Sequence, residues 1–158
     1  MSKPLGDTLP RELLAALDGT DLAGKIGPAY LLVTSDVDGT PRPCMLSAGE
    51  TLAVDGRRLR VALWRGSRTG ANLARGSRAL FCHVAPSSVV YVRGAARALE
   101  ADPSFGLDCF ELAVDSVETD EHAGMPVTTG ITFAVERADP ATVVEAWEQQ
   151  LAALRAAT

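Results

Sequence analysis

The chain has 158 residues, of which 47% are hydrophobic and 22% charged, and its formal net charge is −5. These values are typical of one soluble globular domain with a hydrophobic core. No apolar stretch approaches the roughly 20 residues that cross a bilayer. The N-terminus lacks the apolar segment of a signal peptide, so we expect a cytoplasmic protein with no membrane partner.

The first part of the chain predicts a helical extension followed by two strands. Residues 1–27 form the extension, in which residues 10–17 have the pattern of a short helix. Residues 29–34 form an apolar strand, and Asp38-Gly39 is a typical hairpin dipeptide that turns the chain into the next strand. That strand contains two prolines, which lack a backbone donor and therefore favour a sheet edge or a bend: Pro41 and Pro43.

The middle of the chain contains the strongest hairpin signal and a short basic helix. Residues 51–54 and 58–63 have strand patterns on either side of Asp55-Gly56. Residues 68–75 fit a short helix, with Ser67 as its N-cap.

The remaining elements complete a mainly β pattern. Four further strands are expected, over residues 79–84, 88–94, 109–117 and 127–135. In the third of these the apolar phase slips between Val114 and Val117, which a β-bulge would explain. Asp139 and Pro140 then begin a C-terminal helix, assigned to residues 138–158. We therefore expect a mainly β fold with some α-helix, an antiparallel β-barrel with one short helix in the barrel region and one helix at the end.

Positive charge is concentrated in one segment of this acidic chain. Residues 56–99 contain nine arginines and no acidic residue, whereas six basic and twenty acidic residues lie elsewhere. A segment of one sign suggests an anionic partner. Pairing of these arginines with acidic residues elsewhere in the fold would explain the same pattern equally well.

Several catalytic and metal motifs are incomplete. Residues 31–40 resemble the Asp-x-Asp-Gly-Thr nucleophile loop of haloacid-dehalogenase-type phosphatases, but that chemistry needs a later lysine, and both lysines precede the motif. A hairpin turn explains the stretch completely. The same shortage of lysine excludes a P-loop. The chain has no Cys-x-x-Cys and only two histidines, so we predict no metal site and free thiols in a reducing compartment.

The stretch around the predicted N-cap has the chemistry of a phosphate receptor. The free backbone N–H groups and the helix dipole favour an anion, and the side chains of Ser67, Arg68 and Thr69 add donors. The preceding strand ends in Leu63-Trp64, whose indole could lie beside a flat ring attached to that phosphate. An ordinary capped surface helix would have the same sequence, so this stretch alone does not decide between the two interpretations.

These motifs follow one another in a characteristic order: residues 42–47, the Asp55-Gly56 hairpin, residues 63–69, Asn72-Leu73, residues 89–94 and residues 110–117. The order resembles that of the FMN-binding split-barrel family, the pyridoxamine 5′-phosphate oxidase-like superfamily. The resemblance extends from about residue 29 to residue 135, which is most of the chain.

The resemblance implies one FMN-binding split-barrel domain over residues 1–158, which forms a homodimer with cofactor sites at the subunit interface. In this family an arginine at the position of Arg42 helps to hold FMN, and a Ser-Arg-Lys triplet at residues 67–69 grips the flavin phosphate. The cofactor-binding residues that it implies are Arg42, Met45, Ser47, Leu63, Trp64, Arg65, Ser67, Arg68, Thr69 and Asn72.

The chain departs from the family pattern at several positions. Ser47 and Thr69 stand where the oxidases have lysines, and Val89 stands where a glutamine usually contacts the flavin. The C-terminal arginine and histidine pattern that binds the oxidase substrate has no match after residue 135. We therefore do not expect oxidation of pyridoxamine phosphate.

The leading hypothesis is an FMN-binding oxidoreductase of unknown substrate, with hydride transfer through flavin N5 and no catalytic residue assigned. Its partners would be a small-molecule substrate or a redox partner, and no nucleic acid. The first alternative is a related split barrel that binds a deazaflavin or haem. The second is a non-catalytic module that binds nucleic acid or another polyanion, against which the low aromatic content of 5% argues.

Overall fold

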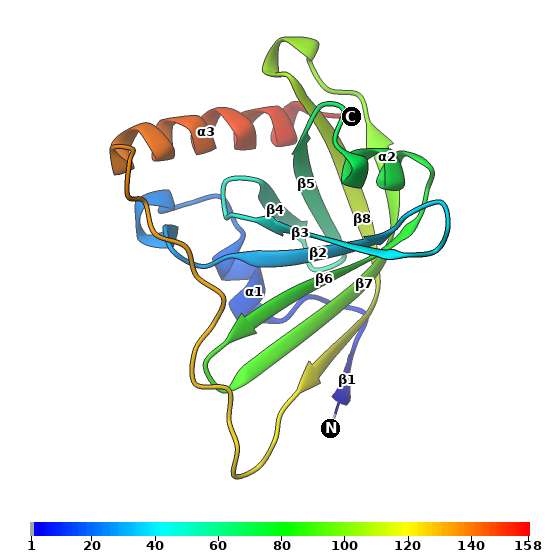
Figure 1. Ribbon diagram of the computed structural model, residues 1–158, viewed down its shortest axis with the longest axis vertical. Coiled ribbons are helices and arrows are strands. Elements are labelled where there is room, and N and C mark those ends of the chain that lie inside the picture. Colours follow the sequence, from blue (N-terminus) through cyan, green and yellow to red (C-terminus); the bar gives the residue numbers. More distant parts are fainter. Residues whose placement is uncertain (1) are drawn as a thin grey trace.

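The computed structural model describes residues 2–158, which form one antiparallel sheet with helices packed around it (Figure 1). The strands are β1 (Ser2–Gly6), β2 (Tyr30–Ser35), β3 (Pro41–Leu46), β4 (Thr51–Asp55), β5 (Arg58–Trp64), β6 (Arg78–Ala85), β7 (Ser88–Leu99) and β8 (Leu107–Asp120). The α-helices are α1 (Arg11–Ala16), α2 (Arg68–Ala74) and α3 (Pro140–Ala156), and the 3-10 helices are η1 (Leu22–Lys25) and η2 (Pro103–Phe105).

The strands follow the order β3-β2-β6-β7-β8-β5-β4, with β1 added to β8. The sheet therefore ends at β3 on one side and at β4 on the other, and its curvature gives a split barrel. The expected mainly β fold with a short helix and a C-terminal helix is confirmed. Since β3 is an edge strand, the placement expected from its two prolines is confirmed as well.

The predicted β-bulge lies in β8. Register with β7 pairs Arg93 with Ser116 but Gly94 with Val114, so Asp115 is the extra residue. A side chain at residue 94 would meet the Ala113 carbonyl oxygen 2.5 Å from its Cβ. The close approach of the two strands at the bulge therefore requires a glycine there.

Two expectations from the sequence are wrong. Both edges of β2 are paired, with β3 and β6, so residues 127–135 lie beside the chain just before β2 and form no strand among the described residues. The segment therefore makes one isolated bridge, between Pro28 and Thr132. Residues 1–27 are not wholly helical, because β1 pairs with β8. All five β1 residues are exposed, so no apolar alternation marked this strand.

The C-terminal helix closes one end of the core. Asp139 caps α3 by accepting a hydrogen bond from the Ala141 N–H, and Trp147, Leu151 and Leu154 are buried beneath the helix. None of the helices formed by residues 2–158 has both the length and the apolar character that a bilayer crossing requires.

Candidate functional site

The short helix α2 lies beside the turn that joins β2 to β3 (Figure 1). Ser67 caps it as predicted, since its Oγ accepts a hydrogen bond of 3.1 Å from the Gly70 N–H. Asn72 is almost fully buried and connects α2 to the turn. Its Nδ2 donates to Thr34 Oγ1 at 3.0 Å and to Asp36 Oδ1 at 2.9 Å. Residues far apart in the sequence therefore meet at one site.

Asp36 is the centre of this site. The Arg42 guanidinium donates to it through two nitrogens, at 2.7 Å from Nε to Oδ1 and 2.6 Å from Nη2 to Oδ2. The Arg42 and Asn72 hydrogen bonds, together with the charge of Arg68, hold the pKa of Asp36 well below its usual value. The carboxylate therefore stays ionised, and it neutralises the arginine that the resemblance assigns to the cofactor.

Arg75 closes the same network from the other end of α2. Its Nη2 donates to Asn72 Oδ1 at 2.7 Å and to the Ser35 carbonyl at 3.2 Å. The Asn72 amide thus uses its oxygen and its nitrogen at once, which fixes its orientation. Asn72 acts here as a positioning residue for Asp36.

Arg68 differs from the other arginines of the basic segment. Seven form ion pairs with carboxylates: Arg57 with Asp7, Arg58 with Asp55, Arg60 and Arg97 with Glu111, Arg65 with Asp108, Arg78 with Asp115 and Arg93 with Glu118. Arg75 donates to Asn72 and to carbonyl groups. Within residues 2–158, Arg68 forms no hydrogen bond or ion pair and only influences Asp36 through space. Its guanidinium is exposed beside a pocket of about 440 Å³ that Asp36, Asn72 and Arg75 also line.

The pairing of the other arginines answers the question that the charge pattern raised. The excess of positive charge in residues 56–99 is balanced by acidic residues from elsewhere in the fold. A broad basic surface, which a polyanion-binding module requires, is therefore not what this segment builds.

Ser67 and Thr69, the sequence neighbours of Arg68, lie in different surroundings. Thr69 is buried, so its side chain points into the protein. Burial raises the pKa of the Cys44 thiol above its usual value and outweighs the effect of Thr69, which lies close enough to that thiol to lower it. Ser67 is half-buried and lines a second pocket, of about 400 Å³, between α2 and the start of β8.

The end of β5 supplies three more of the predicted residues, with different surroundings. Leu63 is buried in the core, whereas Trp64 is 65% exposed on the opposite face of the strand. Arg65 lies in the second pocket and pairs with Asp108 at 3.5 Å. Trp64 and Arg65 are therefore accessible to a ligand, whereas Leu63 is not.

Met45 and Ser47 lie apart from Arg68. Side chains alternate along β3, so Arg42 and Cys44 face α2 while Met45 projects from the other face. Ser47 follows the strand and donates from its N–H and its Oγ to Glu50, each at 2.8 Å. Both residues line an apolar groove beneath α3. The structure therefore does not bring the ten predicted residues into one site.

Sequence reasoning missed the role of Asp36. The Asp-x-Asp-Gly-Thr stretch correctly predicted a turn, and this explanation left no role for the first carboxylate. A signal was nevertheless present, because an aspartate before a tight turn and an arginine six residues later are diagonal neighbours across a hairpin.

Comparison with known proteins gives one close relative in sequence. No protein-family model matches the chain. YclD of Bacillus subtilis, an uncharacterized protein, is 30% identical over 145 residues, which cover 90% of this chain and 93% of that protein.

Solved structures with low sequence identity share the fold. A candidate pyridoxamine 5′-phosphate oxidase from Lactobacillus delbrueckii superposes with a TM-score of 0.52 at 19% identity, covering 73% of this chain and 98% of that one. An FAD-binding protein from Mycobacterium smegmatis gives a TM-score of 0.50 at 16% identity, covering 78% and 100%. A haem-binding protein from the same organism gives 0.50 at 18% identity, covering 85% of this chain and 60% of that one.

Proposed function

The chain belongs to the family of Bacillus subtilis YclD and has the split-barrel fold of the pyridoxamine 5′-phosphate oxidase-like superfamily, and on this premise we propose that it is an FMN-binding oxidoreductase. The single observation that carries the proposal is the unpaired Arg68. An exposed guanidinium without a partner, in a segment where the other arginines are engaged, is the donor that an external phosphate needs.

The residues around Arg68 fit a phosphate group. The Ser67 hydroxyl uses its oxygen as the helix cap, and its hydrogen remains available for donation. Arg42 directs two nitrogens at Asp36 and keeps its third nitrogen, Nη1, for another acceptor. Phosphate bound here would receive one full positive charge from Arg68 and a partly neutralised one from Arg42. When bound, FMN supplies hydride transfer at its N5 atom, and this chain binds and orients the cofactor.

Trp64 is the residue that we assign to the flat part of the cofactor. Its indole is 65% exposed and precedes the α2 cap by three positions. An exposed aromatic face near a phosphate site favours stacking against a planar ring.

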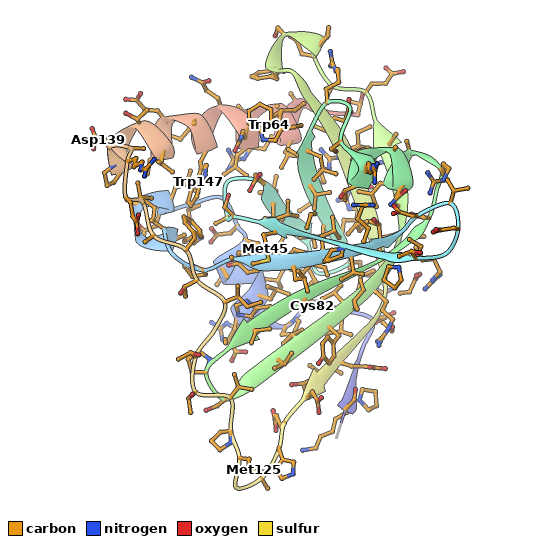
Figure 2. All side chains as sticks on the ribbon, in the orientation of Figure 1. Met45, Trp64, Cys82, Met125, Asp139 and Trp147 are labelled. Atoms are coloured by element: carbon orange, nitrogen blue, oxygen red, sulfur yellow. The ribbon has the colours of Figure 1, made fainter. Side chains whose placement is uncertain are left out.

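A second copy of the chain is part of the proposal. Strand register places Met45, Leu31, Cys82 and Tyr91 in one row across β3, β2, β6 and β7. Met45 and Cys82 lie on the same face of the sheet (Figure 2). A continuous apolar row on an outer sheet face is typical of a subunit interface, so we propose a homodimer through this face. Leu31→Asp should yield a monomer in sedimentation velocity, and an unchanged sedimentation coefficient would contradict this interface.

Haem is less well supported than a flavin. His83 lies inside the barrel, where its ring stacks on Tyr30 with centroids 5.3 Å apart, and burial lowers its pKa. A histidine held this way is poorly placed to ligate an iron at the α2 site. A deazaflavin with a phosphate group would satisfy the same donors as FMN, so the two are separated by experiment.

The proposed function is tested by titrating the purified protein with FMN, riboflavin, a deazaflavin and haem while recording absorbance spectra. We expect saturable FMN binding at micromolar concentration, at least tenfold tighter than riboflavin binding because riboflavin lacks the phosphate. Equal affinity for FMN and riboflavin would contradict the phosphate site. If the protein binds haem or the deazaflavin but not FMN, that molecule would take the place of FMN as the proposed cofactor.

A further inference from the structure

A groove of about 400 Å³ lies at the C-terminal end of β3, between that strand, residues 132–135 and helix α3. Its principal walls are Met45, Ser47, Glu50, Phe133, Val143 and Trp147. None of these six residues lines either pocket at α2. The groove is therefore a second site on this strand.

Two aromatic rings form one wall of the groove. Trp147 lies on the side of α3 that faces the sheet (Figure 2). Phe133 meets it edge to face, with ring centroids 6.2 Å apart and an interplanar angle of 71°. A Cβ at residue 49 would overlap the indole, so the ring packs directly on the backbone of Gly49. Because Trp147 is only 6% exposed and packs against both Phe133 and Gly49, this wall of the groove is rigid.

A carboxylate lies among these apolar side chains. Oε2 of Glu50 accepts hydrogen bonds from the N–H and the Oγ of Ser47, each at 2.8 Å. Thr51 Oγ1 donates to the Ser47 carbonyl at 2.7 Å, which further fixes this turn. No ion pair with a lysine or arginine involves Glu50 anywhere in residues 2–158. The groove therefore contains one fixed negative charge that no basic side chain balances.

The partly exposed ring of Phe133, backed by Trp147, and an unbalanced carboxylate form the chemistry that recognises a flat cation. A positive charge is attracted both to the negative face of an aromatic ring and to a carboxylate. An anionic ligand would be repelled by Glu50, and an uncharged one would leave the carboxylate partly desolvated without a partner. We propose that this groove binds a planar aromatic molecule with one positive charge, and that this is the substrate class of the enzyme. The role as a substrate site rests on the proposed function, whereas binding itself does not.

The test uses the full chain with Trp64→Phe, which leaves Trp147 as the only tryptophan, so that fluorescence reports on the groove. The protein is titrated without flavin, using 1-methylquinolinium as the flat cation and 1-methylnaphthalene as its neutral isostere. We expect saturable quenching of Trp147 by the cation with an affinity about tenfold or more above that of the isostere.

Two substitutions in this background identify the charge responsible. Glu50→Gln should lower the affinity for the cation about tenfold and leave that for the isostere unchanged. The unchanged isostere also shows that the groove has kept its shape. The matched control is Glu148→Gln, at an exposed position one residue after Trp147, which should change neither affinity.

Each of three results would overturn the inference: equal affinity for the two probes, no saturation, or a Glu50→Gln variant that binds the cation as before. Trp147 emission that changes with protein concentration but not with either probe would assign the groove to a second copy instead. FMN affinity is measured separately by absorbance. Cation binding without FMN binding contradicts only the proposed function, and FMN binding without cation binding contradicts only this inference.

Discussion

The α2 site and the groove beneath α3 lie at opposite ends of the same edge strand, and their contents differ. On the α2 side, Arg42, Asp36, Asn72 and Arg75 satisfy one another, and the positive charge of Arg68 remains unpaired. In the groove, apolar side chains surround Glu50, whose negative charge remains unpaired. In both regions a binding site is better indicated by the charge that the fold leaves without a partner than by the number of charged residues.

The largest loss of unfolding free energy is expected when the ion pairs that hold α3 in place are broken. Arg60 donates to Glu111 at 2.9 Å and to the carbonyls of Leu154 and Ala157 at the end of α3. Burial raises the pKa of Glu111, and the guanidiniums of Arg60 and Arg97 outweigh this and hold it below its usual value. Arg60→Met leaves this carboxylate with Arg97 alone and should lower the free energy of unfolding by about 3 kcal/mol in urea.

Arg60→Met should also affect the two sites differently. Helix α3 forms a wall of the groove but lines neither pocket at α2. Folded Arg60→Met protein should lose quenching of Trp147 by the cation while it retains FMN affinity. Arg57→Met is the control, because its pair with Asp7 is exposed and should contribute less than about 1 kcal/mol. Equal destabilisation by the two variants would contradict the assigned role of Arg60.

The next largest loss of stability is expected when the aromatic wall of the groove is disturbed. Gly49→Ala places a methyl group where the Trp147 ring lies, so the buried indole must move. Overpacking of this kind should cost about 2 kcal/mol of unfolding free energy and shift Trp147 emission to longer wavelength. Thermal denaturation and a fluorescence spectrum in the Trp64→Phe background measure both. An unchanged melting temperature would show that the ring is not fixed.

A smaller effect is expected from pH at the α2 site. The pKa of Asp36 is lowered in the folded chain, mainly by Arg42, relative to about 3.9 in an unfolded chain. The stability that its ionised form confers is therefore present above about pH 4 and is lost as pH falls below that value. Asp36→Asn should flatten the dependence of unfolding free energy on pH between 5 and 2. The same slope in variant and native protein would contradict the assignment.

Much of the fold could be predicted because its signals are local. Asp55-Gly56 specifies a hairpin, Ser67 an N-cap and the Val114–Val117 phase slip a bulge, and all three occur where expected. The segment 127–135 could not be predicted in the same way. Its residues are suited to a strand, but they lie beside the short stretch before β2, and both edges of β2 itself are paired with β3 and β6. This depends on the whole sheet order.

The candidate site was predictable to a smaller extent, for the same reason. Arg68 was identified from the cap motif, yet its special status depends on partners that the other arginines find far along the chain. Arg60 and its partner Glu111 are 51 residues apart, and Asn72 and its partner Asp36 are 36 apart. The groove was not anticipated as a site, because Trp147 approaches β3 only through the packing of α3.

The central claim is that Arg68 holds the phosphate of a flavin cofactor. The most direct test measures FMN and riboflavin affinity for the native chain, Arg68→Ala and the control Arg78→Ala, whose arginine is already paired with Asp115. Arg68→Ala should weaken FMN binding about tenfold or more and leave riboflavin binding unchanged, because one charge-assisted contact to phosphate is lost. Arg78→Ala should change neither affinity. FMN affinity that is the same in native and Arg68→Ala protein would contradict the claim.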